Sequence, residues 1–117
     1  MTSGWPTSDP DPFSIESTDS GAWWCRMTLS GVFDMAGAPQ FRQAVDGALS
    51  RGRQHIAVDT SAVTFMDSSG LSAVLAARAD VLAAEGTFRL TAVSAQVARI
   101  LDMAALTDAL LDKRQGT

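Results

Sequence analysis

The sequence is poor in the residues on which most small catalytic and metal sites depend. Its 117 residues include one histidine, one cysteine and a single lysine, Lys113. These counts exclude an intrachain disulfide, a zinc site of Cys and His ligands, and a P-loop lysine placed ahead of a helix. What is present is a 46% share of hydrophobic residues, which at this length predicts one domain with one core and no second, catalytic domain.

Basic charge is also scarce. The net charge is −4 and the nine basic residues are scattered, which argues against a nucleic-acid-binding surface. No apolar run approaches the ~18 residues of a membrane span. The chain starts with Asp9, Asp11 and three prolines where a signal peptide has a basic and then an apolar stretch. We therefore expect a cytoplasmic protein that binds neither nucleic acid nor a membrane.

The start of the chain differs in composition from the rest. Residues 1–12 hold three of the four prolines, with Ser, Thr and Asp between them, and cannot bury enough apolar surface to offset the entropy of ordering. We predict a disordered N-terminal tail over 1–12, a folded domain over 13–113 and a C-terminal tail over 114–117. Trp5 either packs back onto an apolar surface of the domain or is solvated.

Two strand patterns open the folded part. Phe13–Thr18 and Ala22–Leu29 are joined by Asp19-Ser20-Gly21, a sequence typical of hairpin turns, and this predicts antiparallel pairing. Alternation in the second segment places one set of side chains on one face, namely Trp23, Cys25, Met27 and Leu29, and a second set on the other, namely Trp24, Arg26 and Thr28. An exposed Trp24 would be covered by the tail or available to a partner.

A helix and a central strand come next. Pro39, a residue favoured at the first helical position, opens a helix that ends near Gly52. Its apolar face comprises Phe41, Val45, Ala48 and Leu49. The apolar run His55–Asp59 is typical of a strand covered on both faces, and a loop over Thr60–Asp67 is expected to follow it.

The remaining elements alternate in the same way. A second helix starts at Ser68-Ser69-Gly70 and stops at Gly86, and its shared face comprises Leu71, Val74, Leu75, Arg78 and Leu82. Phe88–Val93 is predicted as the last strand. Ser94 is a typical N-cap for a helix carrying Val97, Ile100 and Leu101, and Leu106–Leu111 adds a final amphipathic turn or two.

This order predicts a fold of the α/β class. We expect a single domain with a mostly parallel four-stranded sheet, an antiparallel N-terminal edge strand and about four helices. Because βαβ crossovers are right-handed and here keep moving in one direction, the helices should lie mainly on one face.

The loops at the carboxyl ends of the parallel strands are the candidate functional loops. The richest is the one before the second helix, where Asp67, Ser68 and Ser69 meet a helix start beside Gly70. One reading is that Ser68 or Ser69 caps the helix. The other is that the exposed hydroxyl accepts a phosphate, which the helix N-terminus would favour. Both readings can hold together.

An enzymatic role for Ser69 is disfavoured by its surroundings. A nucleophile elbow needs Gly-x-Ser-x-Gly, and Asp67 stands where the first glycine belongs. The one histidine, His55, is separated from Asp59 at the strand end by about 13 Å and cannot serve as the base. Asp59 itself lacks the acid pair and the late-strand lysine of a phospho-accepting receiver site. We therefore predict no catalytic residues and no metal site.

Residues Val63–Leu71 resemble the signature of the STAS family, the domain shared by anti-sigma factor antagonists and the cytoplasmic tails of sulfate transporters. Within it, Phe65–Leu71 (FMDSSGL) is close to the antagonist form of the motif. The resemblance extends to Leu29–Asp34, His55–Asp59 and Val97–Met103, and it spans residues 13 to 112.

The resemblance implies a binding module with a covalent switch rather than an enzyme. It implies that Ser69 is phosphorylated by an anti-sigma factor with serine kinase activity and that a dedicated serine phosphatase reverses the reaction. The unphosphorylated form would sequester the anti-sigma factor and release a sigma factor for transcription. ATP belongs to the partner, so the resemblance implies no cofactor for this chain.

Carried over by position, the resemblance also implies a partner-binding surface, which comprises Asp34, Asp67, Ser68, Gly70 and Leu71. Two positions depart from the family pattern, Val32 where Glu is frequent and Ala105 where glycine is frequent. They bear on partner choice and on the angle of the last helix. The alternative is a STAS domain serving another assembly, a lipid-transport complex or a stress-signalling particle, without a phosphorylation cycle.

Overall fold

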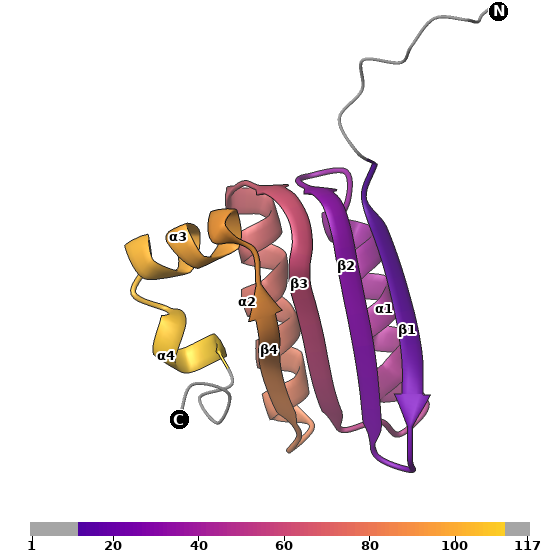
Figure 1. Ribbon diagram of the computed structural model, residues 1–117. Helices are drawn as coiled ribbons and strands as arrows, with labels where there is room; N and C mark the ends of the chain where they lie inside the picture. Colours follow the sequence, from indigo (N-terminus) through magenta and orange to yellow (C-terminus); the bar gives the residue numbers. More distant parts are fainter. Residues whose placement is uncertain (1–11, 112–117) are drawn as a thin grey trace, which may run out of the picture.

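The computed structural model describes residues 12–111 and shows a four-stranded sheet with four helices (Figure 1). The elements in chain order are β1 Ser14–Ser20, β2 Trp24–Phe33, α1 Ala38–Ser50, β3 His55–Met66, α2 Ser68–Ala83, β4 Thr87–Val93, α3 Ala95–Met103 and α4 Thr107–Leu110. Apart from Pro12, the two predicted tails lie outside the described residues.

The sheet has the predicted topology. Its strand order is β1-β2-β3-β4, β1 pairs with β2 antiparallel, and the β2–β3 and β3–β4 pairs are parallel. Both crossovers move in the same direction, and α1 and α2 accordingly cover one face together, while α3 and α4 lie beyond β4 (Figure 1). The carboxyl ends of β2 and β3 and the start of α2 therefore meet at one edge of the molecule.

The hairpin turn lies two residues later than predicted. Ser20 pairs with Trp24, so the turn consists of Gly21, Ala22 and Trp23, and Gly21 adopts the positive φ of +68° that such a turn requires. Asp19 remains in β1, where its carboxylate binds arginines across the molecule. Trp23 is 58% exposed and does not join the buried face, whereas the rest of the predicted alternation in β2 is confirmed.

The predicted loop over Thr60–Asp67 is wrong, because β3 continues as a strand to Met66. Its ladder with β2 persists through two irregularities to a last pair, Phe33 with Met66. The polar residues that indicated a loop are accommodated in the strand: Thr60 is fully buried and its hydroxyl donates to the Ala92 carbonyl at 3.0 Å. Pairing with a long neighbouring strand thus overrode the local polarity.

The buried face of α2 also differs from the prediction. The residues that face the core are Gly70, Ala73, Val74, Ala77 and Val81. Leu71 and Leu75 are only partly buried and Leu82 is 44% exposed. Small side chains let the helix approach the sheet closely, so the stripe of small residues was the packing face and the leucines flank it.

The other helices agree with the sequence. Helix α1 has Pro39 in its first turn and buries Phe41, Val45 and Ala48. In α3 the Ser94 hydroxyl caps the helix by accepting from the Val97 backbone N–H at 3.2 Å, and Val97 and Leu101 are buried. The core is a single cluster between the sheet and the helices.

Candidate functional site

The cap of α2 is an aspartate and neither of the two serines. Asp67 is the N-cap, and its Oδ1 accepts hydrogen bonds from the backbone N–H groups of Ser69 at 2.9 Å and Gly70 at 3.1 Å. The capping role that the sequence left open for Ser68 or Ser69 is thus filled by the preceding residue. Neither serine hydroxyl is therefore needed to cap the helix.

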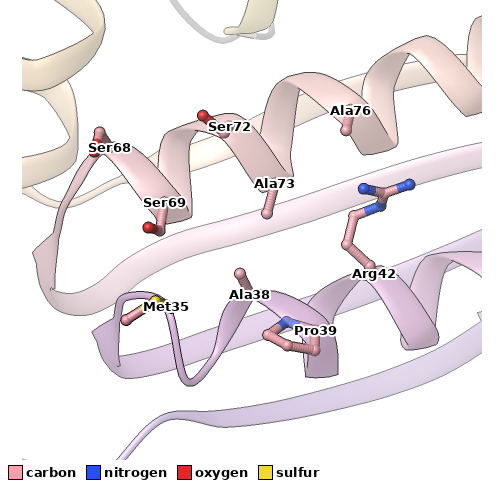
Figure 2. Close-up of a pocket in the computed structure, with 9 residues that line it drawn as sticks. All are labelled: Met35, Ala38, Pro39, Arg42, Ser68, Ser69, Ser72, Ala73 and Ala76. Carbon is pink, nitrogen blue, oxygen red and sulfur yellow. The ribbon is translucent and has the colours of Figure 1, made fainter.

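The two serines differ in where they point. Ser68 is exposed and points away from α1, whereas Ser69 is half-buried and points toward the start of α1 (Figure 2). Within the described part of the chain, neither hydroxyl makes a hydrogen bond. The capped helix therefore holds Ser69 in position, while its hydroxyl makes no hydrogen bond with the described residues.

Gly70 supports this helix start from below. It is buried, and a Cβ at this position would overlap the carbonyl oxygen of Phe33 and approach Met66 Cγ at 3.0 Å. Only glycine allows the first turn of α2 to lie this close to the end of β2. Gly70 thus holds the predicted partner surface in place without presenting a side chain on it.

An open groove runs between α1 and α2 in front of Ser69, with a volume of about 570 Å³. The segment that leads into α1 and α1 itself contribute Met35, Ala38, Pro39 and Arg42, and α2 contributes Ser68, Ser69, Ser72, Ala73 and Ala76 (Figure 2). Hydroxyls thus follow one side of a largely apolar groove. A groove of this composition suits a partner segment with small or apolar side chains.

Arg42 places the one guanidinium of the groove beside Ala76, beyond the serines (Figure 2). Its Nη2 lies 3.0 Å from Oδ2 of Asp80 on α2, and both side chains are about two-fifths exposed. Because the pair is solvated, it contributes little to stability, roughly 0–1 kcal/mol.

Two acidic residues follow the strands at this edge. Asp34 and Asp67 come directly after Phe33 and Met66, the last pair of the β2–β3 ladder. Asp34 Oδ1 accepts from the Ala36 N–H at 3.0 Å and thereby shapes the segment into α1. The structure thus places Asp34 at the end of β2 and Asp67 at the cap of α2, and both add negative charge to the edge that carries Ser69.

Exposed apolar side chains that the sequence reading did not single out adjoin the same edge. Met35 is 74% exposed and Phe65 is 45% exposed, while Leu71, which was predicted there, is partly buried against the core. A sequence signal existed for Phe65, because alternation in β3 sets it opposite the buried Met66. No such signal marked Met35, which lies in an irregular segment.

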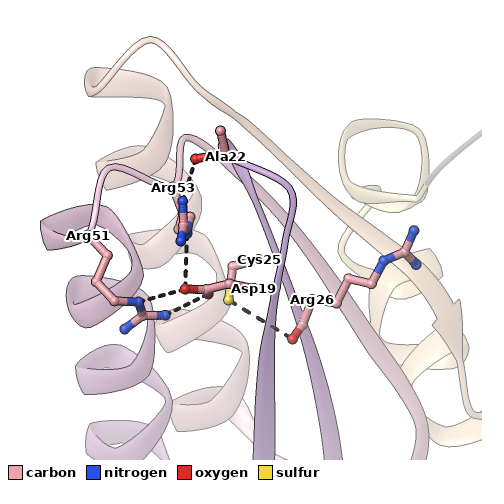
Figure 3. A network of polar contacts seen from close by, with 6 residues as sticks. All are labelled: Asp19, Ala22, Cys25, Arg26, Arg51 and Arg53. Atoms are coloured by element: carbon pink, nitrogen blue, oxygen red, sulfur yellow. Dashed lines mark hydrogen bonds and ion pairs between the residues drawn. The ribbon is translucent and has the colours of Figure 1, made fainter.

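Polar residues at the opposite end of the sheet are engaged with one another. Asp19 binds Arg51 through two hydrogen bonds of 2.8 and 2.9 Å and Arg53 through a contact of 3.0 Å, and Arg53 also donates to the Ala22 carbonyl (Figure 3). Arg51, followed by Arg53, holds the pKa of Asp19 well below its usual range. The turn after α1 thus carries two partly exposed arginines that both pair with Asp19.

His55 lies at this same end, away from Ser69. Its Nδ1 is 2.9 Å from the Thr87 hydroxyl and its ring is 5.1 Å from that of Trp24. Among residues 12–111 no group of three or more His, Cys, Asp or Glu side chains is arranged to hold a metal ion. In the same range, no helix has the length and apolar character to cross a membrane.

Comparison with known proteins identifies relatives of this fold. The family described as "Mlab, STAS domain" matches residues 18–112. An anti-sigma factor antagonist from Mycobacterium paratuberculosis is 26% identical in sequence, with a TM-score of 0.74 over 88% of this chain and 86% of that one.

Two structures of SpoIIAA show the same fold at 22% identity. The unphosphorylated form of this anti-sigma factor antagonist gives a TM-score of 0.75 over 85% of this chain and 87% of its own. The phosphorylated form, described as a Bacillus cell fate determinant, gives a TM-score of 0.70 over 85% of this chain and 90% of its own. A search of the curated proteins finds no significant match.

Proposed function

The chain belongs to the STAS domain family, and we propose that within it the protein is an anti-sigma factor antagonist, a non-enzymatic cytoplasmic switch. Its unphosphorylated form binds and sequesters an anti-sigma factor with serine kinase activity, which releases a sigma factor for transcription. Phosphorylation of Ser69 ends this binding, and a serine phosphatase restores it. The relative at 26% identity is described as an anti-sigma factor antagonist, which supports the proposal.

The observation that carries the proposal is the state of the Ser69 hydroxyl. It lies at the start of a 16-residue helix whose cap is supplied by Asp67, and it points into an open groove. A kinase can reach such a group without unfolding the helix. The positive end of the helix dipole also favours a phosphate there by roughly 0.3–1 kcal/mol.

The local charge explains how one phosphate could end binding. A phosphoserine adds about −1.5 to −2 charges at neutral pH, here at the edge that also carries Asp34 and Asp67. A hundredfold loss of affinity corresponds to about 2.7 kcal/mol. A single like-charge contact at ~4 Å and an effective dielectric constant near 20 is worth about 4 kcal/mol before screening. If the partner surface is acidic, one phosphate therefore suffices.

The remaining predicted positions have distinct tasks in this proposal. Asp34, Asp67 and Ser68 present polar groups to the partner, and Gly70 keeps the surface in register. Leu71 contributes only the part of its side chain that is not packed on the core. We add Met35 and Phe65, whose exposed side chains suit an apolar contact.

The proposal is tested by phosphoryl transfer. The purified chain is incubated with the kinase-type anti-sigma factor and ATP, and the phosphorylated residue is mapped by mass spectrometry. Ser69→Ala is expected to abolish uptake of phosphate, while the neighbouring Ser68→Ala, its matched control, retains it. Equal uptake by wild type and Ser69→Ala would show the site to be wrong. A partner that binds this surface but transfers no phosphate would favour a STAS domain of another assembly.

A further inference from the structure

The guanidinium group of Arg42 makes a single hydrogen bond within the described residues. Its Nη2 donates to Asp80 Oδ2 at 3.0 Å. Its Nε is buried and has no hydrogen-bond partner among these residues. A buried N–H group without an acceptor is uncommon in folded proteins and calls for an explanation. Because Arg42 lines the same groove as Ser69, an anion placed in that groove could accept from this donor.

Arg42 and Ser69 lie along the same side of α2. The residues that form this side recur at intervals of four, three and four positions, namely Ser69, Ala73, Ala76 and Asp80. Figure 2 shows Ser69 at one end of the groove and the Arg42 guanidinium near Ala76 at the other, with the small side chains of Ala38 and Ala73 between them. The path from Arg42 to Ser69 along the groove is thus lined by small residues.

We propose that a phosphate on Ser69 draws Arg42 away from Asp80 and is then held by Arg42 across the groove. Nε and one Nη of the guanidinium donate together to two phosphate oxygens, so the donor that lacks an acceptor gains one. The exchange is favourable because the phosphate carries about −1.5 to −2 charges against −1 on Asp80, and the exposed pair with Asp80 is weak. The inference rests on the proposed phosphorylation of Ser69 and adds what the phosphate does within this chain.

The two side chains are long enough to meet. Arg42 lies beside Ala73 and Ala76, which follow Ser69 by about 6–10 Å along the helix axis. Packed helices lie about 8–10 Å apart, so the Cα atoms of Ser69 and Arg42 are at most about 14 Å apart. An extended arginine spans about 7 Å from Cα to Nη, a phosphoserine about 5 Å from Cα to its outer oxygens, and a hydrogen bond about 3 Å. The contact therefore needs side-chain rotation and no movement of either helix.

The exchange changes the shape of the groove as well as its charge. In the unphosphorylated chain Arg42 is held at the far end by Asp80, and the part of the groove in front of Ser69 is open. When Arg42 pairs with the phosphate, its side chain crosses the groove over Ala38 and Ala73. Asp80 loses its cation at the same time, so the groove still gains the full negative charge of the phosphate. Phosphorylation thus obstructs a partner segment sterically in addition to repelling acidic groups.

The test uses the full chain with phosphoserine introduced at position 69 during translation, so it needs neither the kinase nor the anti-sigma factor. The pH titration of the phosphate is followed by ³¹P NMR, with a midpoint near pH 6. A guanidinium in contact favours the dianion, so Arg42→Gln should raise the midpoint by about 0.5 or more. Equal midpoints with and without Arg42→Gln would overturn the proposal.

The matched control is Arg78→Gln, which removes the same charge from α2. Arg78 follows Ser69 by nine residues and therefore lies on the opposite side of the helix. Its substitution should leave the midpoint within about 0.1, because a solvated charge at this distance is largely screened. The acidic residues of the groove and its edge are the same in these chains, namely Asp34, Asp46, Asp67 and Asp80. An equal rise in both variants would refute a specific role of Arg42.

Two further measurements separate a direct contact from a distant charge effect. The Arg42 Nε–H signal should move downfield and exchange more slowly with water when Ser69 carries the phosphate. An unchanged signal would overturn the contact even if the midpoint responds. Asp80→Asn removes the competing carboxylate and should give a midpoint equal to or below that of the phosphorylated wild type. A higher midpoint would show that Asp80 positions Arg42 for the phosphate, which contradicts the exchange.

The outcome is separable from that of the phosphoryl-transfer experiment. If the kinase phosphorylates Ser69 but neither the midpoint nor the Nε–H signal depends on the contact with Arg42, this inference is wrong and the proposed function stands. If the contact forms in the chain with introduced phosphoserine but the kinase transfers no phosphate to Ser69, the contact is supported and the proposed function is refuted.

Discussion

Near the start of β3, Asp19 pairs with both Arg51 and Arg53, so each of these three charges has a partner. At the end of β3, Asp67 accepts hydrogen bonds only from backbone N–H groups, and the hydroxyls of the two serines beside it make no hydrogen bond within the described residues. Both ends join a strand to a helix with polar residues. At the start of β3 the polar side chains bind one another and stabilise the fold. At the end of β3 the serine hydroxyls are free to bind a partner. Unused groups in a rigid setting mark the end where a partner is expected.

The largest predicted effect concerns Gly70, where the first turn of α2 lies close to the end of β2. In Gly70→Ala the new Cβ overlaps the Phe33 carbonyl oxygen, and we expect the free energy of unfolding to fall by about 2–3 kcal/mol in urea titrations. Gly47→Ala is the control: a Cβ there meets only Arg51 Nη1 at 3.5 Å, and stability should rise by about 0.5–1 kcal/mol. A fully stable Gly70→Ala would mean that α2 can shift away from β2.

A second prediction tests how negative charge at Ser69 changes the affinity for the partner. Ser69→Asp adds a carboxylate beside Asp34 and Asp67, and we expect at least a tenfold weaker binding of the anti-sigma factor in calorimetric titrations, a cost of about 1.4 kcal/mol. Ser69→Asn has nearly the same shape without the charge and should bind within about threefold of wild type. If both variants bind as wild type does, the electrostatic account of the switch is wrong.

A third prediction separates capping from recognition. Asp67→Ala removes the cap of α2 and Ser94→Ala removes that of α3, and each should cost about 1 kcal/mol of stability in thermal or urea unfolding. Only Asp67→Ala should also change anti-sigma factor binding, because Asp67 adjoins Ser69. Equal binding by the two variants would limit Asp67 to a structural role.

The smallest effect is expected near the start of β3, where Asp19 pairs with Arg51 and Arg53, and it depends on pH. Arg51 and Arg53 lower the pKa of Asp19 in the folded state, so the ionised carboxylate stabilises the fold above the unfolded-state pKa of about 3.9. This contribution is lost as the pH falls below that value toward the folded-state pKa. Asp19→Asn should therefore be less stable than wild type at pH 7, and the gap in urea midpoint should shrink between pH 5 and pH 3.

The control for this pH series is Asp46→Asn on the exposed side of α1. Its midpoint should stay close to that of wild type across the series. A gap for Asp19→Asn that is constant with pH would indicate a packing effect of the substitution and not the loss of an ion pair.

The sequence predicted those parts of the fold that depend on neighbouring residues. Ser94 was identified as a cap because capping needs one hydroxyl and one helix start, and both are local. The burial of Cys25, Met27 and Leu29 followed from alternation alone. The motif also marked the junction at Ser69 correctly as a helix start at the carboxyl end of a strand, although whether Ser69 is phosphorylated stays a prediction.

The errors have a common cause in contacts between distant segments. The polar run after Asp59 was read as a loop, but its pairing with β2 makes it a strand. The leucines of α2 were expected at the core, but the small residues Gly70, Ala73 and Ala77 allow a closer approach to the sheet. The pairing of Arg51 and Arg53 with Asp19 likewise had no local signal, because Asp19 is more than thirty residues away.

By itself, the amino-acid sequence determined the element order, the parallel sheet with its antiparallel edge and the position of the helix that begins at the serines, because periodicity, turn residues and chain handedness act over short stretches. Only the tertiary structure decided that Asp67 and not a serine caps this helix, and that Ser69 points into a groove beside α1. These properties depend on how strands register and how closely a helix packs, and no local pattern encodes those distances.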